Sequence, residues 1–469
     1  MDFSWKIVID AGAIAIAILV ATLIRAKFRF FQKYLIPNAL TAGFILLPIY
    51  NFVLPAMGYS ANKLGELVYH LLNISFIAMT LRSSPPKVKG HSGGGVLGMA
   101  GGILSGYALQ SLLGLGLTLF FLPGLFPSFG LFLPLGFASG PGQSYAIGKG
   151  WEAMGFAGAS TVGLTVAAIG YLWGCFGGIW LINHGRKKGW LEGEGLSKLE
   201  DRAILTGIVP RDKERLIGSR LTTDSDSIDS FSFHTAAVVF TYLLSYLFLR
   251  LLTWLLHFAG PTGMELATNL WGLNFVFSAI IAIFVRKLVD AAKLDHLLDD
   301  DTLSRITGFS VDFMLAGSIA AISLTFVLEY WFPIVLMTAL CGLMTLVVTP
   351  WMCSRMFHDS RFERMLMIYG VNTGTLSTGL ALLRVTDPEF KTRVASDYML
   401  SAGLTFAMAI PFVMTINFPA WAHTRGTMAW YWAEIGVSLV YLGVVVAIYL
   451  RLAGKRAFSK PGQIWYKGE

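Results

Sequence analysis

Two polar, glycine-rich stretches interrupt a sequence that is otherwise strongly apolar. They read FASGPGQSYAIG at 137–148 and YGVNTGTLSTGL at 369–380. Glycine and proline break a helix, and a broken helix leaves carbonyls that bind hard cations and N-termini that attract anions. Hydroxyl and amide side chains add hydrogen bonds without a buried charge. The two stretches therefore predict a binding site for a small anion and a cation, and the candidate substrate-binding residues in them are Ser139, Gly140, Gly142, Gln143, Ser144, Asn372, Thr373, Gly374, Thr375, Ser377 and Thr378.

Other polar residues lie within apolar runs. Asp312 stands in FSVDFMLAGS, and an ionisable residue inside a membrane segment usually marks a function. We include it as a substrate-binding candidate, either for ion coupling or for recognition of a substrate amino group. Asn73, in LLNISFIAMT, occupies the matching region of the first half of the chain. Two further interruptions, Pro37-Asn38 and Gly272-Leu273-Asn274, are expected to kink scaffold helices, and substrate contact there is the alternative.

The sequence contains no arrangement of residues that would serve catalysis. It has no HExxH, GxSxG or Walker motif, and its eight histidines are scattered. Cys175, Cys341 and Cys353 lie in or beside apolar segments without CxxC or zinc-like spacing. We therefore predict that the protein is not an enzyme, has no organic cofactor and has no metal centre built from cysteine or histidine.

The elements that must hold the two polar stretches are membrane helices. Of the 469 residues, 55% are hydrophobic and 14% are charged, whereas a typical soluble domain has about 25% charged residues. About 20 apolar residues are needed to span a bilayer. We predict an all-α polytopic membrane protein in which the polar stretches 129–148 and 364–384 form re-entrant hairpins, with eleven crossings at 7–24, 35–57, 65–82, 94–122, 157–183, 233–258, 266–285, 306–328, 331–350, 394–417 and 429–450.

The basic residues predict the orientation of these crossings. If the N-terminus is outside and the two hairpins do not cross, most of the 36 Lys and Arg residues fall in cytoplasmic loops, as the positive-inside rule requires. The C-terminus is then cytoplasmic. The net charge of +8 reflects this topology, and we predict no nucleic-acid partner.

Five crossings precede the polar segment 185–232, so a second half of the same design starts from the opposite side of the membrane. Such inverted repeats are a common plan of secondary transporters. In each half a polar Gly-rich stretch is followed by a helix that contains Gly-Leu-Thr, at 163–165 and 403–405. We predict repeat one at 1–184, a cytoplasmic connector at 185–232, repeat two at 233–417, and an extra helix with a basic tail at 418–469.

At these residues the chain resembles the bacterial sodium:glutamate symporter family. The first similar segment is KYLIPNALTAGFILL at 33–47, and the second is the first hairpin at 138–156. The others are 162–178, 306–322 and 365–383. The resemblance implies two inverted five-helix repeats, a homodimeric scaffold and a mobile transport domain that carries both hairpins. It also implies sodium-coupled uptake of L-glutamate across the cell inner membrane, by an elevator-like movement within the lipid. Where family members typically have Gly-Gly-His-Gly, the first hairpin here has Gly140-Pro141-Gly142-Gln143.

Under this interpretation the hairpins meet near mid-membrane from opposite sides. Hairpin amides, hydroxyls and helix ends would bind carboxylates, and freed carbonyls would hold sodium together with Thr165, Thr405 and Asn73 as candidate ligands. One alternative is a transporter of the same fold for another small carboxylate or amino acid, coupled to protons through Asp312. An alternative of a different class is a membrane sensor or regulatory scaffold that acts through 185–232.

Overall fold

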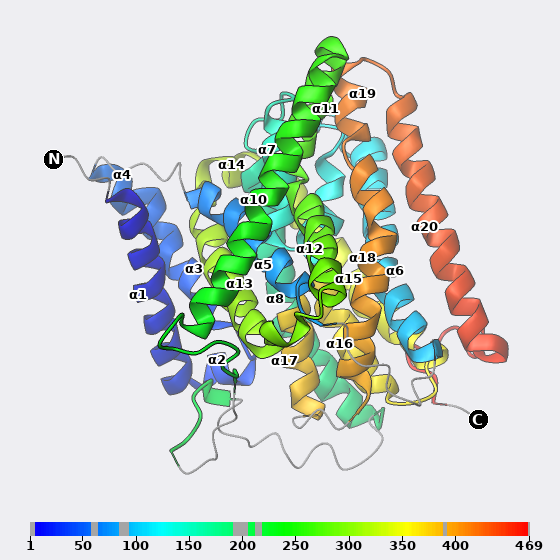
Figure 1. Ribbon diagram of the computed structural model, residues 1–469. Coiled ribbons are helices and arrows are strands. Elements are labelled where there is room, and N and C mark those ends of the chain that lie inside the picture. Colours follow the sequence, from blue (N-terminus) through cyan, green and yellow to red (C-terminus); the bar gives the residue numbers. More distant parts are fainter. Residues whose placement is uncertain are drawn as a thin grey trace.

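The computed structural model describes residues 5–57, 64–83, 93–190, 205–211, 218–387 and 392–467. All regular structure within these residues is helical, and long helices run side by side through the molecule (Figure 1). The all-helical architecture predicted from the sequence is therefore confirmed. Parts of the predicted connector, 191–204 and 212–217, lie outside the described residues.

Eight described helices are long and apolar enough to cross a membrane, which is compatible with a membrane location. One of them, Asn38–Ala56, is made of α3 (Asn38–Pro48), the π-helical η1 (Ile49–Val53) and α4 (Leu54–Ala56). Another, Val394–Thr424, comprises α18 (Val394–Thr415) and α19 (Phe418–Thr424). The others are α1 (Lys6–Lys27), α6 (Gly93–Phe120), α8 (Ala159–Lys188), α10 (Ser230–His257), α15 (Trp331–Met356) and α20 (Ala429–Ala453), which runs on into η6 (Gly454–Arg456).

The remaining three predicted crossings are shorter or interrupted. The helix α5 (Leu64–Thr80) has 17 residues. The run 266–285 is divided at Leu273 between α11 (Gly260–Gly272) and α12 (Asn274–Ala291). The run 306–328 is divided between α13 (Asp300–Ala320) and α14 (Leu324–Glu329). Whether these helices cross the membrane stays a prediction.

Helix ends follow local sequence signals. Asp229 and Asp299 precede α10 and α13, and each carboxylate accepts a backbone N–H from the first turn, at 3.1 Å and 2.8 Å. Such side-chain caps satisfy donors that have no partner within the helix. The helix α8 lies between Gly158 and Gly189, which both have positive φ. Short helices at the periphery are α2 (Arg29–Lys33) and η5 (Asp295–Leu297).

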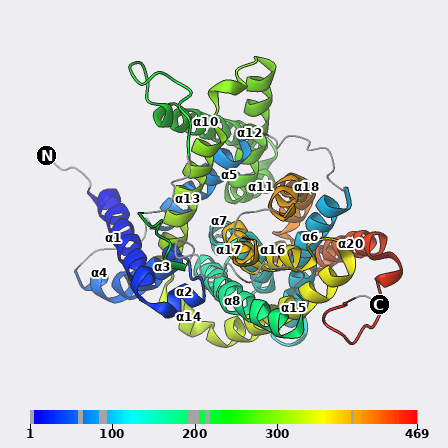
Figure 2. The same cartoon turned by 90° about the horizontal axis from the view of Figure 1, so that it is seen from below.

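The helices form two groups with the polar stretches between them. In the first group, α13 packs against α3 and α5, α1 packs against α3, and α10 and α12 pack against α5. In the second group, α6 packs against α18 and α20, and α15 packs against α6 and α8. Seen from below, α7 (Pro141–Glu152), α16 (Arg361–Thr373) and α17 (Leu376–Thr386) lie between these two groups (Figure 2).

Contacts between the two halves of the chain are reciprocal. The helix α3 of the first half packs against α13 of the second, and α12 of the second packs against α5 of the first. In the same way, α6 packs against α18, and α8 packs against α15. Two related halves of opposite orientation would give this pattern. The division into repeats stays a prediction with which the contacts agree.

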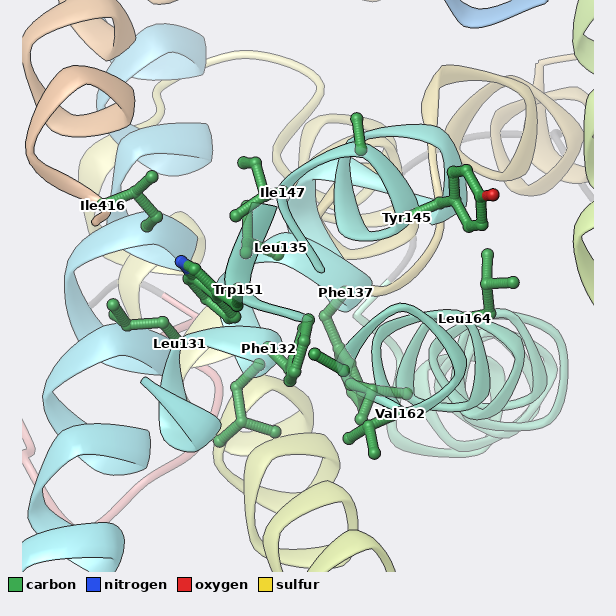
Figure 3. Packing of buried hydrophobic residues seen from close by; sticks show 14 of the residues in the cluster. Leu131, Phe132, Leu135, Phe137, Tyr145, Ile147, Trp151, Val162, Leu164 and Ile416 are labelled. Atoms are coloured by element: carbon green, nitrogen blue, oxygen red, sulfur yellow. The ribbon is translucent and has the colours of Figure 1, made fainter. Parts of the chain in front are cut away.

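The largest apolar core surrounds the first polar stretch (Figure 3). The Phe132 and Trp151 rings lie 4.8 Å apart between centroids. The indole Nε1 of Trp151 donates to Asn417 Oδ1 at 2.8 Å, which ties this stretch to the end of α18. The stretch packs against α8 through Leu135 and Phe137, which belong to the same apolar cluster as Val162 of α8. A polar, glycine-rich segment is thus held in a well-packed interior.

Candidate binding site at two helix breaks

The first polar stretch forms a hairpin, here called hairpin one, whose turn is a helix break. Its incoming arm contains η3 (Phe129–Leu131) and the π-helical η4 (Pro134–Ser139), and its outgoing arm is α7 (Pro141–Glu152). Between them Gly140 has φ 93° and ψ 179°, a conformation that residues with a Cβ rarely adopt. Pro141 then starts α7, where its missing N–H costs nothing. Within the described residues no side chain caps this helix N-terminus.

The second polar stretch forms hairpin two. Its arms are α16 (Arg361–Thr373) and α17 (Leu376–Thr386), and Gly374 and Thr375 separate them. Gly370 and Gly379 let the arms approach, because a Cβ on Gly370 would lie 2.5 Å from the Gly379 Cα. The N-terminus of α17 also lacks a side-chain cap in the part of the chain that the structure describes. Both breaks therefore leave helix N-termini at the tips of their hairpins.

The two hairpin tips meet inside the molecule. A Cβ on Gly140 would lie 3.0 Å from Thr375 Cγ2. In Figure 1, α7 lies in the upper part of the molecule, and α16 and α17 lie in the lower part. The hairpins therefore approach each other from opposite ends of the helix bundle.

Hydroxyl groups line both sides of this contact. Tyr171 of α8 donates its hydroxyl hydrogen to Thr375 Oγ1 at 3.1 Å, and Thr375 and Ser377 share a hydrogen bond of 2.8 Å. Ser139 Oγ donates to the hydroxyl of Tyr107, on α6, at 3.3 Å. The tips thus present neutral donors and acceptors beside two helix N-termini, which suits an anion that also needs directional hydrogen bonds.

The helix α6 holds the end of α16. The Asn372 side-chain amide donates to the carbonyl of Gly102 at 2.9 Å, and the Gln110 amide donates to the carbonyl of Asn372 at 2.8 Å. The latter bond satisfies a carbonyl that the helix break has freed. Gly106 makes room for Asn372, because a Cβ there would lie 2.7 Å from Asn372 Cγ.

The helix α8 packs against both hairpins through small residues. A Cβ on Gly163 would lie 2.9 Å from the carbonyl oxygen of Ser144 in hairpin one. A Cβ on Gly170 would lie 2.6 Å from the carbonyl oxygen of Thr373 in hairpin two. Such close backbone approach through small residues is typical of membrane helices. The helix α8 therefore fixes the two hairpins relative to each other.

Several buried polar atoms near the breaks have no hydrogen-bond partner among the described residues. They are Ser144 Oγ, Asn372 Oδ1, Thr378 Oγ1 and Gln110 Oε1, and their side chains are at most 3% exposed. The Thr378 hydroxyl points back to the break, since a Cβ on Gly374 would lie 2.5 Å from it. Buried polar groups are nearly always paired. These atoms therefore indicate a region that binds a ligand or ordered water.

The other predicted residues differ in their surroundings. A Cβ on Gly142 would touch Leu72 and Met314, so this glycine serves the packing of α7 against α5 and α13. Asp312 of α13 is exposed, and it lies close enough to Tyr171 for the two groups to interact electrostatically. Gln143 is buried beside the break.

The structure does not bring the three predicted sodium ligands together through hydrogen bonds. Thr165 donates its hydroxyl to the carbonyl of Thr161 in its own helix. The Thr405 hydroxyl is buried without a partner among the described residues. Asn73 accepts a hydrogen bond from Ser278 at 2.9 Å, and Ser278 bonds to Ser245 at 3.0 Å. Asn73 thus belongs to a buried network that joins α5, α10 and α12.

Sequence reasoning missed Tyr107, Gln110 and Tyr171. One signal was available for α6, since Gly98, Gly102, Gly106 and Gln110 recur every four residues, a spacing that places them on one helix face. The tyrosines had no such signal, because a tyrosine in an apolar run is normally part of the core.

A buried ion pair at the base of hairpin two was also missed. Arg364 Nη2 lies 2.7 Å from Asp397 Oδ2 and 2.8 Å from Asp359 Oδ2. The Arg364 and Asp397 side chains are 1% and 2% exposed, although Asp397 lies in the first turn of α18. This pair anchors α16 to the start of α18.

Comparisons with models of protein families, with curated proteins and with solved structures found no match.

Proposed function

We propose that the protein is a secondary active transporter for a small carboxylate, with L-glutamate as the first candidate and sodium as the coupling ion. The observation that carries this proposal is the close approach of Gly140 to Thr375, where two helix N-termini meet that no described side chain caps. A helix N-terminus carries a partial positive charge and free N–H groups. Two of them at one place favour a substrate with two carboxylates, which glutamate has.

The hydroxyl and amide groups at the tips would select the substrate. Thr375, Ser377 and Ser139 offer hydrogen bonds whose donors rotate, and Asn372 Oδ1 is an acceptor without a partner among the described residues. An acceptor of this kind suits the amino group of an amino acid. The last carbonyls of α16, next to Thr373, would bind sodium. The resemblance to sodium:glutamate symporters supports the same assignment.

Alternating access would follow from the arrangement of the two groups of helices. The hairpins pack on α6 and α8 and reach the site from opposite ends of the bundle. We propose that the hairpins are re-entrant and move with α6 and α8 against the group formed by α1, α3, α10 and α12. Homodimerisation through that group is part of this proposal, as the resemblance implies.

Uptake by purified protein in liposomes tests the proposal. Thr375→Val removes one hydroxyl at the tip contact and keeps the side-chain shape, and Thr235→Val removes a partly exposed hydroxyl on α10 as the matched control. We expect sodium-driven uptake of labelled L-glutamate by the wild type and the control, and at least a tenfold loss in Thr375→Val. Equal uptake by both variants would contradict the site. Uptake that persists without sodium and is lost in Asp312→Asn would instead identify the proton-coupled alternative.

A further inference from the structure

A carboxyl group lies buried in α20, outside both predicted repeats. Glu434 is 0% exposed, although α20 is one of the eight helices long and apolar enough to cross a membrane. Both of its carboxyl oxygens lack a hydrogen-bond partner among the described residues. Ser438, one turn further along, is equally buried and its hydroxyl is likewise without a partner there.

The buried face of α20 holds Glu434 firmly in place. Tyr431 donates its hydroxyl to the carbonyl of Leu115, on α6, at 2.7 Å. Tyr441 donates to the carbonyl of Met408 and accepts the N–H of Phe412, both on α18. Glu434 lies between these two anchors on the same face, because the spacing of three and seven residues matches the helix period. The carboxyl cannot turn to the surface while both anchors hold.

No Lys, Arg or His within the described part of the chain forms an ion pair with Glu434. The basic groups nearest along the fold are held elsewhere. The helix α19 also packs against α20, and its His423 ring lies 4.9 Å from the Phe126 ring. The Arg425 guanidinium stacks over the Trp421 and Trp430 rings at 4.9 Å and 5.2 Å.

The titratable groups near Glu434 are the neutral phenols of Tyr431 and Tyr441 on α20, and Tyr107 of α6 lies next to Tyr441. On α18 the neighbouring polar group is Thr415. An unpaired carboxylate in such a place is strongly disfavoured.

The Thr415 hydroxyl near Glu434 already has an acceptor on its own helix. The Thr415 hydroxyl donates its only hydrogen to the carbonyl of Phe412 at 3.0 Å. In this orientation the hydroxyl can only accept a hydrogen from Glu434, which the protonated acid has, whereas a hydroxyl rotated toward Glu434 would donate to the carboxylate instead. A hard cation would need several more oxygen ligands than Glu434 and Ser438 supply.

We propose that Glu434 is a proton-binding site, protonated at neutral pH, that holds α20 against α6 and α18. Ionisation would place a charge in this interface and loosen it. The interface is connected to hairpin one through aromatic rings. The Phe412 ring centroid lies 5.6 Å from that of Tyr441 and 5.5 Å from that of Tyr107. Ser139 of hairpin one donates a hydrogen bond to the Tyr107 hydroxyl. The proton site does not depend on the proposed transport function, whereas an effect on substrate binding through this path rests on it.

Infrared spectroscopy of the purified protein without substrate tests the proton site. We expect a carbonyl band of a protonated carboxylic acid at neutral pH that is absent in Glu434→Gln. Glu329→Gln, a matched change at an exposed glutamate at the end of α14, should keep the band. Because Glu434→Gln mimics the protonated form, it should also abolish the fall in thermal stability that we expect for the wild type at alkaline pH.

The absence of such a band in the wild type, or a band unchanged in Glu434→Gln, would overturn the proposal. If Glu434→Gln does not fold, Glu434→Asp keeps a carboxyl group and should shift the band, and an unshifted band would overturn the proposal equally. A confirmed band together with failure of glutamate uptake would leave the proton site intact and contradict only the transport function.

Discussion

We propose that Asn372 combines a structural and a binding role within one side chain. Its amide nitrogen bonds to Gly102 at 2.9 Å and anchors α16 on α6, whereas its buried oxygen has no partner among the described residues. We predict that Asn372→Ala abolishes substrate binding but leaves a folded protein, because one lost hydrogen bond costs about 1 kcal/mol of unfolding free energy. Uptake and the melting temperature without ligand, measured on the same preparation, check this.

Gln143→Ala should behave in the same way, because Gln143 lies in the first turn of α7 beside the first break. Normal uptake by both the Asn372 and the Gln143 variant would remove these residues from the site. A melting temperature that falls far in both would show that their role is structural.

Asp299 allows a pH prediction outside the membrane-spanning segments. Partial burial alone would raise the pKa of its carboxyl, but hydrogen bonds from the Thr302 hydroxyl, the Thr302 N–H and the Arg220 N–H outweigh burial and lower the pKa. A lowered pKa in the folded state stabilises the protein above the unfolded-state pKa of about 3.9, and this stabilisation is lost as pH falls through the folded pKa.

We predict that Asp299→Ala lowers the unfolding free energy by about 1 kcal/mol at neutral pH, as removal of a helix cap does. The difference from the wild type should shrink in strongly acidic solution. Chemical denaturation in detergent at both pH values measures this, with Asp301→Ala, an exposed residue in the same helix turn, as the control. A difference that persists in acid would show that the charge of Asp299 is not responsible.

At the scale of elements, glycines determine how closely α6 and α8 approach the hairpins. Gly106→Ala would place a Cβ 2.7 Å from Asn372 Cγ, whereas a Cβ on Gly116, in the same helix, would have no atom within 4 Å. Overpacking of this kind costs about 1–3 kcal/mol. We predict that Gly106→Ala lowers thermal stability and uptake, and that Gly116→Ala lowers neither. Equal effects of the two substitutions would contradict the role assigned to this face.

The sequence allowed the helices and the polar stretches to be predicted, but not their partners. Gly140 and Gly374 stand out because polar residues there interrupt an apolar run. The close approach of Gly140 to Thr375 joins residues far apart in the sequence, and hydrophobic periodicity carries no information about it. The break at Leu273 was marked by Gly272 and Asn274, and a Cβ on Gly272 would lie 3.2 Å from the carbonyl oxygen of Ala146 in α7.

Glu434 shows the limit of such reasoning. It is a single acidic residue near the start of the apolar run AWYWAEIGVSLVYLG, where the sequence alone fits an interfacial position. Its burial depends on α6 and α18, which supply the facing surface. The burial of Asp397 could not be predicted for the same reason, because its partner Arg364 lies on a different helix.

At the scale of the whole molecule, we propose that the two hairpins and the helices α6 and α8 form one unit that carries the site. The close packing of Gly163 against hairpin one and of Gly170 against hairpin two favours this unit. The polar network of Asn73, Ser245 and Ser278 belongs instead to the group of α5, α10 and α12. A movement between these two groups would change access to the tips without breaking the site.

The most direct test of the central claim is the thermal stability of the purified protein with sodium or potassium, with and without L-glutamate. A ligand that binds only the folded state adds RT ln(1 + [L]/Kd), about 2.7 kcal/mol at a hundredfold excess over Kd. We predict that glutamate stabilises the wild type only when sodium is present, and that Thr375→Val loses this response. Absence of any response to glutamate in the wild type with sodium, or an undiminished response in Thr375→Val, would contradict the claim that the two hairpin tips form the substrate site.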